Sequence, residues 1–228
     1  MRYFLDAAKT LREVLGRIRS RDFSGYQGIA VKNSYYQVFV NMAAKIGSLI
    51  FTIILARILL PELFGLYSLA LSTIMIFTAF SDLGINQTMA RFVSREFGKD
   101  NTKKARAYFL YLGKVKLFFT FLSIVFLMIT ARFISENYYH KPVYLALVVG
   151  SFYILFSTLF VILKSLFEAM NDFKLIFYQE VLFQTARIIL VPGILLFILK
   201  FMASDSAIIA YIIAGLSVSY LTSFAFYL

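Results

Sequence analysis

Two basic side chains lie at places in this sequence where membrane hydrocarbon should surround them. Lys45 lies near the middle of one long apolar run, and Arg187 lies inside another. Each shares a helical face with polar residues, because positions three, four and seven apart are neighbours on an α-helix. The companions of Lys45 are Asn41, Ser48 and Thr52, and those of Arg187 are Glu180 and Gln184. Lipid would penalise such faces, so we expect both to point into the protein or into a wet cavity.

The chemistry that these residues could do is the binding of an anionic group. A few fixed cations in a cavity of low dielectric constant would offset the desolvation of an anionic group, while hydroxyl and amide side chains can hydrogen-bond other polar parts of a ligand. The candidate substrate-binding residues are therefore Lys45, Arg187, Asn41, Ser48, Thr52 and Gln184. The alternative for Lys45 is an ion pair with an acid that serves packing alone.

Residue sets for catalysis are absent from the sequence. It contains no DDxxD pattern, no HExxH, no glycine-rich phosphate loop with a lysine, and no Ser/His/Asp set. It has no cysteine, and its single histidine, His140, stands alone in a short loop. We therefore expect no enzyme, no resident metal and no cofactor.

The composition is that of a protein that crosses the membrane several times. Hydrophobic residues make up 61% of the 228 positions and the mean hydropathy is +0.79, against roughly 45–50% apolar residues in a soluble domain. The net charge of +11 comes from lysines and arginines that cluster between the apolar runs. There they set topology and meet anionic headgroups, so we expect membrane lipids rather than nucleic acid as partners.

We predict an all-α polytopic membrane bundle of about six transmembrane helices. A basic amphipathic segment over residues 1–32 precedes it, either as a helix in the cytoplasmic interface or as a partly ordered tail. The six-span lobe covers residues 33–228, with spans at about 36–60, 66–89, 117–133, 143–163, 175–199 and 207–228.

The distribution of basic residues predicts the orientation. The region from Arg91 to Lys116 holds eight basic residues against two acids, and the segment through Lys32 holds seven against three. Both should lie in the cytoplasm, with two spans between them. The protein is therefore expected in the cell membrane with its amino terminus in the cytoplasm.

Proline and glycine mark two places where the helices should turn or break. Pro61 and Gly65 suit a tight turn between the first two spans, with Arg57 anchoring the end of the first. Pro192 and Gly193 should interrupt the fifth span, either as a bend near a binding site or as an ordinary packing kink.

The stretch from Ile54 to Glu96 carries a motif beyond its hydropathy. Asp82 ends the second apolar run, where an acid needs a function or a partner such as Arg91 or another basic neighbour. The motif resembles the amino-terminal signature of polysaccharide flippases, the Wzx-type exporters of lipid-linked oligosaccharides. The matching residues are Arg57, Leu59, Pro61, Gly65, Tyr67, Asp82, Gly84 and Arg91. These flippases belong to the multidrug/oligosaccharidyl-lipid/polysaccharide exporter superfamily.

The resemblance implies the amino-terminal lobe of a MATE/MurJ-like two-lobed transporter, with a carboxy-terminal lobe on the same protein. It implies alternating access, in which one lobe rocks against the other and a polyprenyl-diphosphate-linked oligosaccharide crosses the membrane. The chain is still apolar at its last residue, which also leads us to expect a second lobe.

Two other functions stay open on the sequence alone. A cation-coupled multidrug extruder of the same superfamily would want an acid in its cavity, whereas the first span offers Lys45. A non-transporting scaffold would dock glycan-assembly enzymes on the basic loop from Arg91 to Lys116. For a scaffold, Lys45 and Arg187 should be replaceable without loss.

Overall fold

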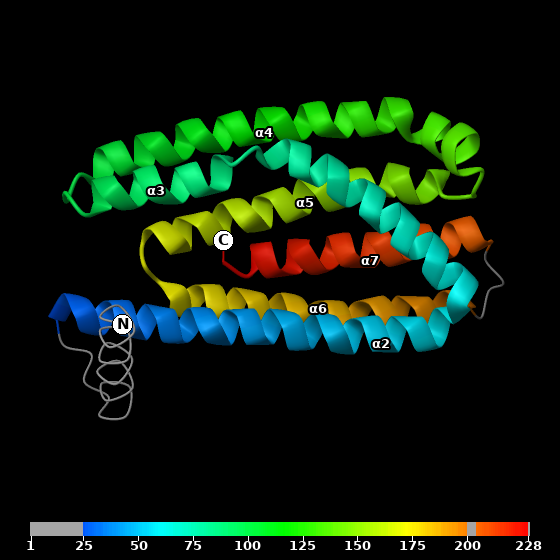
Figure 1. Ribbon diagram of the computed structural model, residues 1–228, viewed down its shortest axis with the longest axis horizontal. Helices are drawn as coiled ribbons and strands as arrows, with labels where there is room; N and C mark the ends of the chain where they lie inside the picture. Colours follow the sequence, from blue (N-terminus) through cyan, green and yellow to red (C-terminus); the bar gives the residue numbers. More distant parts are fainter. Residues whose placement is uncertain (1–24, 200–203, 228) are drawn as a thin grey trace, which may run out of the picture.

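The computed structural model of the protein describes residues 25–199 and 204–227, and every element in these ranges is a helix. In chain order the helices are α2 (Gly25–Asp82), α3 (Ile85–Phe97), α4 (Thr102–Phe133), η1 (Ile134–Tyr139), α5 (Tyr144–Ala169), α6 (Phe173–Leu199) and α7 (Asp205–Ala225). Figure 1 shows them lying lengthwise beside one another, with α7 between α5 and α6. The expected amphipathic segment lies mostly outside the described residues.

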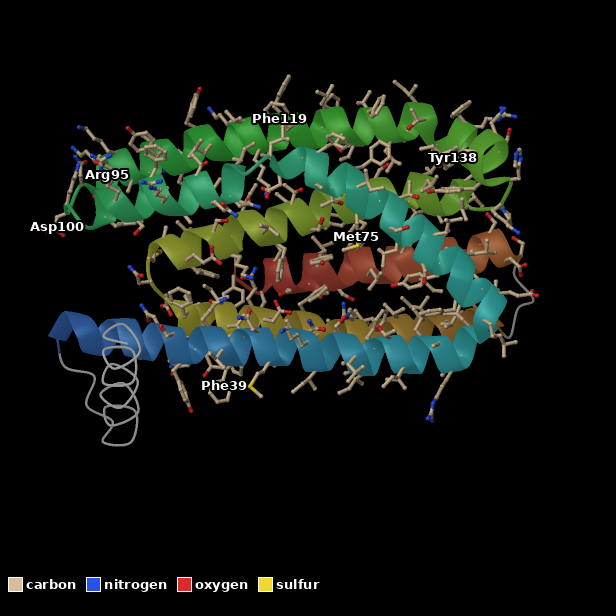
Figure 2. The ribbon with its side chains drawn as sticks, viewed as in Figure 1. Phe39, Met75, Arg95, Asp100, Phe119 and Tyr138 are labelled. Atoms are coloured by element: carbon tan, nitrogen blue, oxygen red, sulfur yellow. The ribbon has the colours of Figure 1, made fainter. Side chains whose placement is uncertain are left out.

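The bundle has two ends, which we name after the elements found there. The α3 end, on the left in Figure 1, holds the turn between α3 and α4. The η1 end, on the right, holds η1 and the reversal of α2. Figure 2 shows Arg95 and Asp100 at the α3 end and Tyr138 near the η1 end.

α2 consists of two arms that meet at Leu60. Leu60 has φ 61° and ψ 163°, outside the helical region, and Pro61 follows with no N–H to donate. The first arm (residues 25–59) runs to the η1 end, and the second arm (residues 61–82) runs back along the bundle (Figure 1, blue and cyan). Gly65 lies inside the second arm, with open space where a Cβ would be. The prediction that Gly65 belongs to the turn is therefore wrong, because the reversal is complete at Pro61.

The protein is an all-α polytopic membrane bundle. Five helical segments among the described residues are long and apolar enough to cross a membrane, and the first of them contains both arms of α2. Large apolar side chains on α4 point outward, with Phe118, Phe121 and Ile129 all exposed. An apolar outer surface is what a lipid environment requires.

The helices do not end where the apolar runs end. α4 begins at Thr102 rather than near residue 117, because Asn101 caps it by accepting the Lys104 N–H at 3.2 Å. The second arm stops at Asp82, before the expected end at residue 89, and α5 begins after Pro142, at Tyr144. Hydropathy marks the thickness of the membrane, whereas caps and positive-φ residues decide the ends of helices.

α6 is continuous through Pro192 and Gly193, so the predicted helix break at these residues is wrong. Pro192 removes one backbone donor, but packing against α7 supports the helix at this level. A Cβ on Gly215 of α7 would lie 3.1 Å from Cγ2 of Val191, which shows how closely the two helices approach. Neighbouring helices commonly keep a proline-containing membrane helix intact.

The core lies where α5 and α7 pack against the second arm and α6. Gly150 of α5 permits the closest approach, because a Cβ there would lie 2.5 Å from Cδ1 of Ile74 on the second arm. Ile74, Ile154 and Ile209 are completely buried. This packing fixes the second arm over α5, and the polar cavities described next form along that contact.

Candidate functional site

A polar cavity of about 400 Å³ lies between both arms of α2 and helices α5, α6 and α7. We call it the arginine cavity, because Arg187 is the charged residue that lines it. Its lining residues are Ser48, Phe51, Thr52, Phe64, Tyr67, Ser68, Leu71, Ser72, Met75, Tyr153, Phe183, Arg187, Leu216 and Tyr220. Its lining thus combines one guanidinium with hydroxyl groups and contains no acid.

Arg187 holds its guanidinium among aromatic rings. The guanidinium carbon lies 4.6 Å from the centre of the Phe51 ring and 5.3 Å from that of Phe183, so cation–π attraction offsets part of its desolvation. Its Nε and Nη2 atoms are buried and have no hydrogen-bond partner within the described ranges. Arg187 forms no ion pair with any described acid. A half-buried cation whose buried donors have no partner is suited to bind an anion.

The fold divides the polar row expected beside Lys45. Ser48 and Thr52 line the arginine cavity, and Thr52 Oγ1 donates to the Ser48 carbonyl at 2.8 Å. Asn41 and Lys45 are exposed and lie outside the cavity lining, and Asn41 accepts a hydrogen bond from the Gln37 amide at 3.4 Å. The structure thus brings two of the four residues to Arg187. The role of Lys45 in substrate binding stays a prediction.

Gln184 and Glu180 hold α6 against the first arm. Gln184 Nε2 donates to Glu180 Oε1 at 2.6 Å and to the Ala44 carbonyl at 3.4 Å. Gly47 leaves room for this side chain, because a Cβ there would lie 2.7 Å from Gln184 Oε1. Gln184 is buried and lies outside the lining of the arginine cavity. Its position indicates packing between two helices, and its contact with a substrate stays a prediction.

A second polar cavity, of about 320 Å³, lies further along the second arm toward the α3 end. We call it the lysine cavity, because Lys116 of α4 lines it together with Asp82 and Asn86. Lys116 is 2% exposed, and its Nζ donates to Oδ1 of Asp82 at 3.0 Å and to Oδ1 of Asn86. Arg91, one of the partners considered for Asp82, is exposed on α3. The basic partner of Asp82 is Lys116 instead.

Lys116 is the residue that the sequence analysis missed. It was placed in the basic loop because it closes a run of lysines and arginines. A signal was nevertheless present, since Lys116, Thr120 and Ser123 have the same four- and three-residue spacing as the polar rows of the other spans. All three are buried, on the inner face of α4.

A helix break lies beside Lys116. Leu83 and Gly84 separate α2 from α3 and have φ values of 40° and 79°. Gly84 adopts this left-handed conformation at little cost, which explains a glycine at this motif position. The Asn86 N–H donates to Asp82 Oδ1 at 3.4 Å. The two acceptors of Lys116 therefore lie on either side of the break, Asp82 before it and Asn86 after it.

The remaining predicted residues and cavities are less suited to bind a polar ligand. Arg57 is exposed near the end of the first arm. An apolar cavity of about 360 Å³ between the second arm and α4 is lined by six hydrophobic residues and Ser123, so its chemistry suits hydrocarbon. No cluster of three or more histidine, cysteine or acidic side chains that could hold a metal occurs in the part of the chain that the structure describes.

Comparison with known protein families shows to which family this bundle belongs. Residues 30–228 match the family described as polysaccharide biosynthesis protein. Neither the curated proteins nor the solved structures gave a match. The matched range includes α2 from residue 30 onward, the motif around Asp82 and every residue that lines the two polar cavities. The chain therefore belongs to the polysaccharide biosynthesis protein family.

Proposed function

We propose that this protein is an exporter that flips a polyprenyl-diphosphate-linked oligosaccharide across the cytoplasmic membrane, and that it catalyses no covalent reaction. The observation that carries the proposal is Arg187, a cation with two unpaired nitrogen atoms in a cavity lined by hydroxyl groups. Membership of the family supports a role in polysaccharide biosynthesis, and the apolar helices support a site within the membrane.

The arginine cavity has the chemistry that a sugar diphosphate needs. A diphosphate loses its hydration on entering hydrocarbon, and a guanidinium replaces that hydration with charge-assisted hydrogen bonds in a planar fork. Ser48 and Ser68 can offer both donors and acceptors to sugar hydroxyls. Thr52 and Ser72 offer acceptors, because their hydroxyls donate to backbone carbonyls. The isoprenoid chain can stay in the surrounding lipid while the polar head crosses.

Transport would proceed by alternating access against the second lobe that the family resemblance implies. The α3 end would face the cytoplasm, because exposed basic residues gather there. They are Arg95, Lys99, Lys103, Lys104 and Arg106, of which Figure 2 labels Arg95. Rocking of the bundle against that lobe would open the arginine cavity to each side of the membrane in turn.

The same cavity argues against two competing functions. A cationic drug would be repelled by Arg187, and the lining contains no acid that could attract it. A scaffold for glycan-assembly enzymes would use the basic α3 end and would leave the cavity without a role. Both alternatives predict that substitution of Arg187 has no effect on glycan export.

Flipping of a polyprenyl-diphosphate-linked oligosaccharide in proteoliposomes tests the proposal with the full-length protein. Arg187→Ala should lower the rate about tenfold or more at unchanged abundance, because each lost charge-assisted hydrogen bond is worth roughly 1.5–3 kcal/mol. Arg187→Lys should recover part of the rate, since it keeps the charge but not the planar fork. Lys45→Ala should have a smaller effect, because Lys45 lies outside the cavity lining.

Arg57→Ala is the matched control, because Arg57 is an exposed arginine outside both polar cavities. Its rate should equal that of the wild type. Equal flipping by wild type and Arg187→Ala would overturn the role of Arg187. Extrusion of a cationic drug without glycan flipping would assign the protein to the multidrug branch.

A further inference from the structure

The arginine cavity and the lysine cavity adjoin each other. Both are lined by Met75, Tyr153 and Tyr220. Along the second arm the arginine cavity covers positions 64–75 and the lysine cavity covers positions 75–82. Figure 2 shows Met75 near the middle of the bundle. At about 1.5 Å per residue the arm rises roughly 27 Å from residue 64 to residue 82, close to the ~30 Å hydrocarbon thickness of a bilayer.

Each cavity contains one cation, and aromatic side chains connect them. Arg187 lies over the Phe183 ring, whose centre is 4.2 Å from that of Tyr220. The Tyr220 ring in turn lies edge-on to Tyr153 at 5.3 Å. The junction between the cavities is therefore built from two tyrosines and the flexible side chain of Met75. Tyrosine hydroxyls can hydrogen-bond a passing anion, and a methionine side chain can adopt other rotamers around it.

The two side chains of the ion pair in the lysine cavity differ in their exposure. This difference permits the Asp82 carboxylate to exchange with another anion. Lys116 is 2% exposed, whereas the side chain of Asp82 is 39% exposed. The lysine is thus held in place, and the acid lies at the surface of the cavity beside the break at Leu83 and Gly84. A phosphate oxygen that takes the position of the carboxylate keeps the buried ammonium paired, and the displaced Asp82, whose side chain is 39% exposed, can turn toward water.

We propose that Lys116 is a second binding position for the anionic group of an isoprenoid diphosphate, and that Asp82 is the counter-ion that occupies Lys116 between transport events. The diphosphate exchanges with Asp82 at Lys116, passes Met75 and the two tyrosines, and binds Arg187. This inference rests on the proposed function and adds to it a second cationic position and an exchangeable counter-ion.

Two separated binding positions for the anion avoid the slow release that a single deep binding position would cause. A single strong cation in a dry cavity holds an anion too tightly for rapid release, whereas successive weaker positions let it enter and leave. When the diphosphate leaves Lys116, the Asp82 carboxylate returns and neutralises the charge of the ammonium. The pair therefore lowers the barrier to release without exposing a bare charge to hydrocarbon.

The decisive variant removes the charges but keeps a polar contact. Asp82→Asn/Lys116→Gln leaves two side chains that can still hydrogen-bond, so abundance and melting temperature should stay near those of the wild type. Flipping of the lipid-linked oligosaccharide should fall about tenfold or more, because the cation is gone. Lys114→Gln is the matched control, since Lys114 is an exposed lysine on the same helix, and it should flip at the wild-type rate.

The single variant Asp82→Asn distinguishes an exchangeable counter-ion from a merely structural pair. It should lower KM, because the substrate no longer competes with a carboxylate, and it should also lower kcat, because nothing returns to Lys116 when the substrate leaves. A merely structural pair would leave KM unchanged, whatever the effect of the variant on stability. That second pattern would overturn the counter-ion role.

A binding measurement separates this inference from the proposed function. A short-chain isoprenyl diphosphate should raise the melting temperature of the wild-type protein in detergent, and the rise should be smaller in the double variant. Inorganic pyrophosphate at the same concentration shows whether the diphosphate is recognised without its lipid. An equal rise in wild type and double variant, together with wild-type flipping, would refute binding at Lys116 and leave the Arg187 proposal standing. Absence of flipping by the wild-type protein would refute the proposed function itself.

Discussion

The Nζ atom of Lys116 lies 3.0 Å from Oδ1 of Asp82, and these two residues join the inner face of α4 to the last residue of the second arm. Asn86, just past the helix break, accepts from the same ammonium. One buried lysine thus stabilises the end of one helix and the start of another. The arrangement is the main polar connection between the second arm, α3 and α4 among the described hydrogen bonds.

Asp82→Ala should destabilise the protein, because it leaves the Lys116 ammonium buried with Asn86 alone. We expect a loss of about 2 kcal/mol, less than the ~3–5 kcal/mol of a fully buried pair, since Asp82 is partly exposed. Thermal unfolding in detergent measures the effect. Lys99→Ala is the comparison, because the Lys99–Glu96 pair lies 3.6 Å apart with an exposed lysine and should be worth less than about 1 kcal/mol. Equal melting temperatures for both variants would contradict a stabilising pair.

Gly84→Ala should destabilise the helix break through its backbone alone. Gly84 has φ 79°, which a residue with a Cβ adopts at a cost of roughly 1–2 kcal/mol, and open space surrounds the position where that Cβ would lie. Gly84→Asn should be milder, because asparagine visits this conformation more readily. Gly65→Ala serves as the control, since Gly65 is helical and exposed, and it should be neutral or stabilising. A neutral Gly84→Ala would contradict the left-handed conformation.

Pro192→Ala should leave both stability and flipping intact. α6 is already continuous at this position, so alanine adds one backbone donor to an existing helix. Melting temperature and flipping rate check this outcome in the same samples. A loss of flipping at unchanged stability would show that the proline contributes to transport beyond the helix geometry.

Cysteine labelling should place the α3 end in the cytoplasm. The sequence contains no cysteine, so Lys103→Cys and Tyr138→Cys each introduce a single exposed thiol at opposite ends of the bundle. A membrane-impermeant maleimide should label position 138 in intact cells and position 103 only after the membrane is opened. Labelling in the reverse pattern would overturn the orientation.

Much of the fold was accessible from the sequence. Apolar runs of spanning length predict membrane helices because water-free hydrocarbon forces every backbone donor into a helix. Pro61 marks the reversal of α2, and the motif with Asp82 and Gly84 indicates the family to which residues 30–228 belong. Of the four polar residues predicted to share one face of the first span, Ser48 and Thr52 line the cavity that contains Arg187, and Asn41 and Lys45 do not.

The tertiary structure alone decided which polar residues meet. Lys45 and Arg187 have similar sequence surroundings, yet Arg187 lines a cavity and Lys45 does not, because the cavity meets the first arm only over residues 48–52. Asp82 has basic neighbours along the chain, but its partner is Lys116, which the packing of α4 brings from a distant position. Helical periodicity determines the face on which a residue lies, whereas the angle and depth at which helices pack determine what that face contacts.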